Sequence, residues 1–195
     1  MSNRNADRPR QRKRASLKAD AERSLRRIVR GLRVASRRVE AASAISSAQL
    51  FVLQQLATAP PLSLRELADR TMTDRTSVAH VVERLEHNAY VERSRSQSDR
   101  RRYDVRITAK GRRLLSRAPV SPTWRLLEAM DQLSLAELHS LSSGLRRLAE
   151  VMGFAGGPAP LLFADTVEGA RRPTGPIDAA KGRSNAVAKG RRGSA

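Results

Sequence analysis

The chain has 195 residues, 39% of them hydrophobic, and its 38 Lys and Arg against 19 Asp and Glu give a formal net charge of +19. This composition supports one ordinary hydrophobic core, and the excess of positive charge is typical of proteins that bind polyanions. Cysteine is absent, which excludes disulfides, thiolate redox sensing and cysteine metal sites. No apolar run approaches the roughly 20 residues of a transmembrane helix and no signal-peptide pattern is present, so we expect a cytoplasmic protein without a membrane partner.

The positive charge is unevenly distributed along the chain. Residues 1–38 contain 14 Lys and Arg against 3 Asp and Glu, and residues 93–113 contain 9 against 2. The rest of the middle of the chain, within residues 39–154, contains 8 against 11 and is slightly acidic. This concentration of charge favours an oriented nucleic-acid surface over general solubility.

At the N-terminus, residues 1–16 contain almost no large apolar side chains and are expected to form a disordered basic arm. A long helix is predicted to begin near Leu17 to Asp20. Apolar residues then recur three or four positions apart and form a continuous seam: Leu25, Ile28, Leu32, Ala35, Val39 and Ala42. One small domain cannot cover so long a seam, so part of it is expected to contact a partner subunit.

A second helix is predicted to begin at a cap formed by Ser47 and to end at Pro60 and Pro61, and Leu62 can form a minimal strand. Two further helices follow over residues 63–70 and 73–86, joined by a very short connection. Ser63 and Glu66 have the spacing of a capping box at the start of the first of these helices. This pair of helices predicts a helix-turn-helix.

The second helix of this pair has two distinct faces. Its apolar residues share one face, which is expected to be buried: Val78, Val81, Val82 and Leu85. The opposite face has small, polar or basic side chains that can approach base edges, and the candidate DNA-binding residues there are Arg75, Thr76, Ser77, His80 and Arg84. Some of these residues are expected to contact only phosphates.

A basic segment and an alternating strand follow over residues 98–111. Val105 and Ile107 alternate with polar residues, as in a strand that has one buried face. This pattern predicts a DNA-binding wing, with candidate contacts from Arg95, Arg100, Arg101 and Arg102. The alternative without a DNA-binding role is a solvated basic hairpin that contacts nothing.

The C-terminal part of the chain predicts two more helical segments and a tail. Thr108 begins a helix that Pro119 and Pro122 end, and another helical segment extends from Thr123 to about Met152. Ser134 and Glu137 repeat the capping-box spacing and indicate a kink or a fresh start. A second apolar seam follows: Leu138, Leu141, Leu145, Leu148 and Met152. Residues 155–195 are expected to form a disordered basic tail rich in Gly, Pro and Ala.

From about Ala48 to Gly111 the chain resembles the MarR-type winged-helix transcriptional regulators. The resemblance rests on three segments in the right order, residues 64–68, 81–93 and 99–111. It implies a homodimer that binds a pseudo-palindromic operator, with the second helix in the major groove and Arg101 in the adjacent minor groove. It also implies that Asp99 braces the wing. Two positions depart from the family pattern: Ala89 replaces a customary glycine, and His80 replaces a basic or polar reader. Asn88 can adopt the left-handed conformation more easily than Ala89.

The predicted fold is therefore mainly α with a small β-wing. A winged helix-turn-helix domain covers residues 17–154, with a DNA-binding lobe at about 47–111 and dimerisation helices at about 17–45 and 112–153. The arm and the tail flank this domain.

The expected function is sequence-specific regulation of transcription by a homodimeric repressor, which the resemblance suggests is released from DNA by a small-molecule effector. The alternative is an architectural, nucleoid-type protein with little sequence specificity. RNA binding is less favoured because only 3% of the residues are aromatic. No catalytic motif, cofactor motif or metal-ligand spacing indicates an enzyme.

Overall fold

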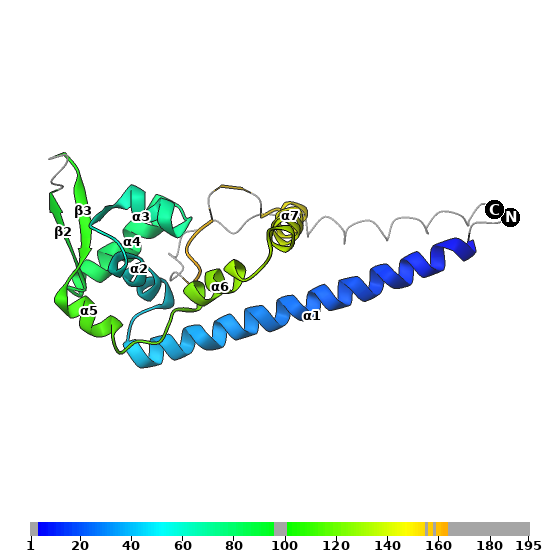
Figure 1. Ribbon diagram of the computed structural model, residues 1–195, viewed down its shortest axis with the longest axis horizontal. Helices are drawn as coiled ribbons and strands as arrows, with labels where there is room; N and C mark the ends of the chain where they lie inside the picture. Colours follow the sequence, from blue (N-terminus) through cyan, green and yellow to red (C-terminus); the bar gives the residue numbers. More distant parts are fainter. Residues whose placement is uncertain (1–3, 96–100, 155, 158, 164–195) are drawn as a thin grey trace, which may run out of the picture. The chain divides into compact units, whose positions relative to one another are not determined.

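The structure is a computed structural model that describes residues 4–95, 101–154, 156–157 and 159–163 (Figure 1). The described residues form two compact units, the first with residues 4–95, 101–132 and 159–163 and the second with residues 133–154 and 156–157. The elements of the first unit are α1 (Arg4–Ser43), α2 (Ser47–Ala57), β1 (Leu62–Ser63), α3 (Leu64–Thr71), α4 (Arg75–His87), β2 (Val91–Arg95), β3 (Tyr103–Ile107), α5 (Ala109–Leu115) and α6 (Pro122–Asp131). The second unit contains α7 (Leu135–Val151).

The helix-turn-helix is formed by α3 and α4, as the sequence predicts. Ser63 caps α3, where its hydroxyl accepts a hydrogen bond from the backbone N–H of Glu66 and the Glu66 carboxylate accepts one from the backbone N–H of Ser63. The predicted apolar face of α4 is buried, and Val78 and Leu85 are both fully covered. These two helices are therefore fixed by a local cap and by one apolar face each.

A three-stranded antiparallel sheet in the order β1-β3-β2 forms the wing. Val91 of β2 pairs with Ile107 of β3, and Leu62 of the short β1 pairs with Val105. Val91, Val105 and Ile107 are buried. The alternating apolar residues of β3 therefore lie on the side of the strand that faces the core.

The core of the first unit is built around α2. Leu50, Phe51, Val52 and Leu53 are almost completely buried, and α3, α4, α5 and α6 all pack against this helix. The cap of α2 is Ser46 and not the predicted Ser47. The reason is that the capping box needs a Gln or Glu three residues later, and Gln49 satisfies this spacing for Ser46. Ser47 lies inside the helix instead.

Helix α1 begins at Arg4, so the expected disordered arm over residues 1–16 does not hold for residues 4–16. The low hydrophobicity of this segment argues against a packed core but not against a helix, since Arg, Lys, Gln and Ala are among the best helix formers. The C-terminal end of α1 packs on α2 and α6: Val39 is buried, and buried Ser36 accepts a hydrogen bond of 2.9 Å from Ser47.

The predicted seam on α1 is only partly covered within this chain. Val39 is 1% exposed, whereas Leu25 is 45% exposed and Ile28 is 52% exposed. The seam therefore continues beyond the part of α1 that α2 and α6 cover.

In the second unit, α7 starts afresh after α6. The capping box of Ser134 and Glu137 that the sequence predicts begins this helix. The predicted seam residues of α7 are all exposed, Leu145 by 45%. Taken by itself, α7 is an amphipathic helix with an uncovered apolar face.

The C-terminal tail contributes a buried leucine to the core. The disorder expected over residues 155–195 does not hold at 159–163, because Leu161 is buried in the core cluster of the first unit. A single leucine has little weight in the mean composition of a long polar segment, although it can fill one gap in a core. The remaining described positions of the tail are residues 156 and 157, and residues 155, 158 and 164–195 lie outside the described part of the chain.

Candidate nucleic-acid interface

Five residues of α4 were predicted to contact DNA. Four of them have solvent-exposed side chains on the outward face of the helix. Arg75, Thr76, His80 and Arg84 are exposed, and the opposite face of the helix is buried in the core. His80 lies 4.0 Å from Glu83, measured between Nδ1 and Oε2. The helix is thus fixed by its apolar side and presents polar and basic groups outward, as reading a duplex groove requires.

The fifth predicted residue, Ser77, is half-buried and belongs to the cap of α4. Its hydroxyl donates to Asp74 at 2.6 Å, and its backbone N–H donates to the same carboxylate at 2.8 Å. Burial raises the pKa of Asp74, but these hydrogen bonds outweigh it and hold the pKa below its ordinary value. The Ser77 hydroxyl is therefore committed as a donor and keeps only its acceptor capacity for DNA.

The turn after α4 corrects a second expectation. Asn88 has a φ of −86°, and Ala89 adopts the left-handed conformation with a φ of 55°. The backbone N–H groups of Ala89 and Tyr90 donate to the carbonyls of Glu86 and Leu85, the pattern of a Schellman motif. This pattern requires the left-handed residue one position after the cap, so the location of the turn overrides the preference of Asn for that conformation.

Of the predicted wing residues, Arg95 lies at the end of β2, and Arg101 and Arg102 precede β3; all three are exposed. Asp99 and Arg100 lie outside the described residues. Two ion pairs hold the strands in place: Arg93 of β2 contacts Glu86 of α4 at 3.2 Å, and Arg106 of β3 contacts Glu92 of β2 at 2.9 Å. The first pair links the wing directly to α4.

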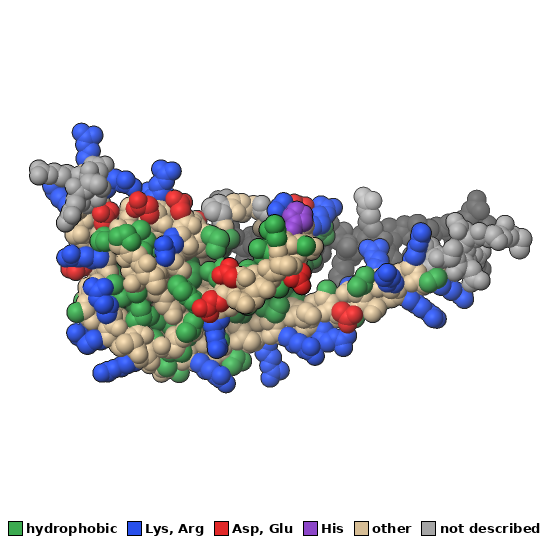
Figure 2. All heavy atoms as spheres, in the orientation of Figure 1, with side chains coloured by type: hydrophobic (Ala, Val, Ile, Leu, Met, Phe, Trp, Pro, Cys, Tyr) green, Lys and Arg blue, Asp and Glu red, His purple; other side chains and the backbone are tan. Residues whose placement is uncertain are grey.

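A basic concavity of about 810 Å³ lies between the start of α3, both ends of α4 and the wing. Four arginines from four different segments line it: Arg65, Arg75, Arg93 and Arg102. Glu86 is the one acidic residue among the described residues that line it, and it is paired with Arg93. Figure 2 shows basic side chains around the wing, with acidic side chains between them. Such a concavity concentrates positive potential where an anion enters.

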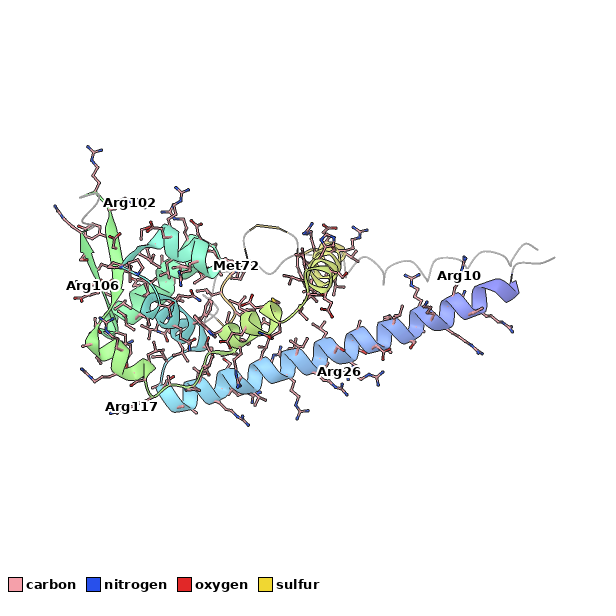
Figure 3. All side chains as sticks on the ribbon, in the orientation of Figure 1. Arg10, Arg26, Met72, Arg102, Arg106 and Arg117 are labelled. Carbon is pink, nitrogen blue, oxygen red and sulfur yellow. The ribbon has the colours of Figure 1, made fainter. Side chains whose placement is uncertain are left out.

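Arg102 also connects the wing to the helix-turn-helix. It donates to the hydroxyl of Ser63 at 3.3 Å, and Figure 3 shows it beside the start of β3. The hydrogen bond from the Ser63 hydroxyl, then that from the Ser63 backbone N–H, and the positive charges of Arg102 and Arg65 lower the pKa of Glu66, against an opposing effect of burial. A single capping box therefore supports both α3 and the wing.

Sequence reasoning missed Arg65 and Arg93 as members of this surface. Arg65 follows the Ser63 cap, and Arg93 is the central residue of β2. Neither residue was named as a candidate, because only the pairing of β2 with β3 and the approach of β3 to α3 bring them together. The sequence signal of Arg65 is a basic residue near the start of a helix, and that of Arg93 is its place at the beginning of the basic stretch 93–113.

The described residues contain no group of three or more His, Asp or Glu arranged to hold a metal ion. Among the helices of the described part, none is long and apolar enough to cross a membrane.

The known proteins to which the chain is similar include transcriptional regulators. Residues 45–103 match the sequence profile of the MarR family. The chain is 35% identical over 97 residues to a Thauera aromatica protein whose name assigns it to transcriptional regulation of the hcr operon, with 50% of this chain and 58% of that protein covered. The chain thus spans a little over half the length of this relative. The structure is similar to that of a MarR family transcriptional regulator from Streptomyces coelicolor in complex with DNA, with a TM-score of 0.51, 26% identity, and coverage of 70% of this chain and 88% of that chain.

Proposed function

We propose that this chain is a transcriptional regulator of the MarR family that binds duplex DNA at specific sequences, and the match of residues 45–103 to that family supports the proposal. The observation that carries the proposal is the basic concavity between α3, α4 and the wing, flanked by the polar outward face of α4. A buried apolar face fixes α4, and the Arg93–Glu86 ion pair ties it to the wing. Helix and wing can therefore approach DNA together.

The roles of the residues follow from their positions. Arg75, Thr76, His80 and Arg84 face outward from α4 and are proposed to contact bases or phosphates in the major groove, with Ser77 as an acceptor. The wing residues Arg95, Arg100, Arg101 and Arg102 are proposed to contact the minor groove and its phosphates, where a narrow groove attracts guanidinium groups. The bracing role of Asp99 rests on the family resemblance alone.

We also propose that the regulator is a homodimer. The uncovered seam on α1 and the uncovered apolar face of α7 both need a partner, and a second copy of the chain supplies a matching surface for each. Two recognition helices related by two-fold symmetry address half-sites about one helical turn apart. Sedimentation at micromolar concentration should show a dimer, and replacing Leu25 and Ile28 with alanine should shift it toward monomer.

Repression, and release from DNA by a small-molecule effector, complete the proposal; both rest on the family resemblance. A reporter gene placed behind the selected operator tests the direction of regulation. Expression that falls when the protein is supplied supports a repressor, and expression that rises contradicts it.

In vitro selection from a pool of random duplexes tests the function. We expect an inverted repeat to be enriched and to be retained in an excess of random DNA. His80→Ala should relax the preference at one position of each half-site, and Arg101→Gln should weaken binding several-fold. Arg10→Gln on α1 is the charge-matched control and should have a much smaller effect.

Equal displacement by random duplex would instead support the alternative, an architectural protein that binds DNA without sequence preference. Residues 1–38 contain 14 basic and 3 acidic residues, and this excess of positive charge favours the alternative. The selection experiment therefore separates the two functions directly.

A further inference from the structure

The middle of α1 carries an arginine stripe that the proposed operator contacts do not use. Between residues 23 and 38 there are seven arginines and no acidic residue: Arg23, Arg26, Arg27, Arg30, Arg33, Arg37 and Arg38. All seven are exposed. At 100° per residue they fall within an arc of about 140°, on the side of the helix opposite the apolar seam. We call this surface the arginine stripe.

Neighbouring members of the arginine stripe are three or four residues apart, the spacing at which like charges destabilise a helix. Acidic residues compensate only at its N-terminal end, where Arg23 pairs with Asp20 and Arg26 with Glu22. Within the described part of the chain, Arg27, Arg30, Arg33, Arg37 and Arg38 have no ion pair. An ordinary solvated helix face would mix the two signs of charge. The unrelieved repulsion therefore indicates a polyanionic partner.

The arginine stripe lies on a different side of the first unit from the wing. Figure 3 shows Arg26 on the side of α1 that faces away from α6, whereas Arg102 lies at the wing. Figure 2 shows basic side chains along the same edge of α1. The stripe and the wing therefore present two separate basic surfaces of the first unit. A second copy that covers the seam would leave the arginine stripe exposed, because seam and stripe are on opposite sides of the helix.

We propose that the arginine stripe is a second contact surface for duplex DNA, which holds the sugar-phosphate backbone of a separate duplex segment without sequence preference. The stripe extends over about 22 Å, roughly two-thirds of a turn of B-DNA, and guanidinium groups are well suited to phosphate oxygens. The protein thereby joins two duplex segments, one at the recognition helix and one along α1.

A lipid surface is the less suitable polyanion for this helix. Amphipathic helices bind membranes by inserting their apolar face, usually with Trp or Phe. The seam of α1 is instead occupied by α2 and α6 at Val39, and residues 4–43 contain no aromatic side chain. Phosphate contact from the arginine side needs no insertion.

The test is the capture of a labelled random 30-bp duplex by full-length protein on beads that carry a second, unlabelled random duplex. Three variants are compared with the wild type. The stripe variant is R27Q/R30Q/R33Q. The matched control is R10Q/R14Q/K18Q, which removes the same charge from the same helix outside the arginine stripe. The wing variant is R101Q/R102Q. Circular dichroism and sedimentation establish that all four proteins have the same helix content and oligomeric state.

We expect the wild type and the control to capture the labelled duplex, and both the stripe and the wing variants to lose capture at least tenfold. Each of these two variants should still bind a single duplex. The stripe changes should also be added to the wing variant. The slope of the logarithm of the single-duplex binding constant against the logarithm of salt concentration should then become shallower by about 2 to 3, since each phosphate contact contributes about 0.9 to this slope. Selection of a specific operator should be unchanged in the stripe variant, so failure of this proposal is distinct from failure of the proposed function.

Three outcomes would overturn the proposal. Capture that persists in the stripe variant means that the two lobes of a dimer hold the two duplexes. Absence of capture by the wild type means that no second surface exists. Binding to phosphatidylserine-containing vesicles that depends on the stripe, together with stripe-independent capture of duplex, assigns the arginine stripe to a lipid surface.

Discussion

The helix-turn-helix lobe and the terminal helices use the same apolar periodicity with opposite results. In α4 the apolar residues are buried, and Leu85 is fully covered. In α1 and α7 the residues at equivalent spacing are open to solvent, as Leu25 and Leu145 show. The apolar faces of the lobe are covered by other elements of the same chain, whereas α1 is covered only at its C-terminal end.

This difference teaches that periodicity identifies an apolar face but not what covers it. A face that finds its partner within the chain stabilises the fold directly. A face that does not is a candidate for assembly, because a large exposed apolar patch marks an interaction site. Substitutions in the two regions should therefore change the free energy of unfolding by different amounts, and these changes should depend differently on protein concentration.

The largest effect is expected from a cavity in the lobe. Leu53→Ala in α2 should lower the free energy of unfolding by about 3 kcal/mol, because its fully buried side chain leaves a cavity behind. The matched change Leu145→Ala in α7 should cost less than about 1 kcal/mol at low protein concentration. Urea denaturation over a dilution series measures both, and equal losses would contradict the contrast between the regions.

Close backbone packing in the lobe should give the next largest effect. Gly111 of α5 lies against the carbonyl of Tyr90, and a Cβ built on it would lie 2.2 Å from that oxygen and 2.8 Å from Ile107 Cγ1. Gly111→Ala should therefore lower stability by about 2 to 3 kcal/mol, since backbone must move. Gly144→Ala in α7, where a Cβ meets nothing within 4 Å, is the control and should stabilise the helix slightly. Thermal denaturation that leaves both midpoints unchanged would show that α5 can shift freely.

The capping boxes of α3 and α7 allow the two regions to be compared by removing one serine hydroxyl from each. Ser63→Ala should cost about 1 to 2 kcal/mol, because Ser63 caps α3 and also accepts from Arg102. Ser134→Ala removes an equivalent but exposed cap from α7 and should cost about 0.5 to 1 kcal/mol. If chemical denaturation gave the same loss for both, Arg102 would contribute nothing through Ser63.

The Ser63 cap also predicts a dependence on pH. The pKa of Glu66 in the folded protein is lower than in the unfolded chain, chiefly because of the hydrogen bond from the Ser63 hydroxyl. The folded state then binds fewer protons, so this stabilisation is present above the unfolded pKa and is lost as the pH falls through the folded pKa. Glu66→Gln should flatten the fall of the thermal midpoint between about pH 5 and pH 3. A curve parallel to that of the wild type would exclude this role.

The smallest expected effect is a gain. Ala89→Gly should raise stability by about 0.5 to 1 kcal/mol, because Ala89 has a φ of 55° and glycine adopts this conformation without strain. Asn88→Gly is the control: its φ of −86° gives no such benefit, and the side chain donates to the carbonyl of Arg84. Stabilisation by Asn88→Gly and not by Ala89→Gly would reverse the assignment of the left-handed position.

The sequence by itself determined the features that depend on neighbours within about four residues. Capping boxes at Ser63 and Ser134, the buried face of α4 and the alternation along β3 all follow from local hydrogen bonds and side-chain periodicity. The left-handed residue was misplaced at Asn88, because intrinsic preference is weaker than the geometry of a helix end that Tyr90 and Leu85 complete.

Only the tertiary structure decided what distant residues do together. Arg65, Arg75, Arg93 and Arg102 come from four segments and meet because β3 pairs with β1 and β2 beside the helix-turn-helix. The burial of Leu161 and the limit of coverage along α1 were settled in the same way. Contacts between residues far apart in the chain depend on how elements pack, and packing depends on complementary surfaces that the periodicity of a single element does not specify.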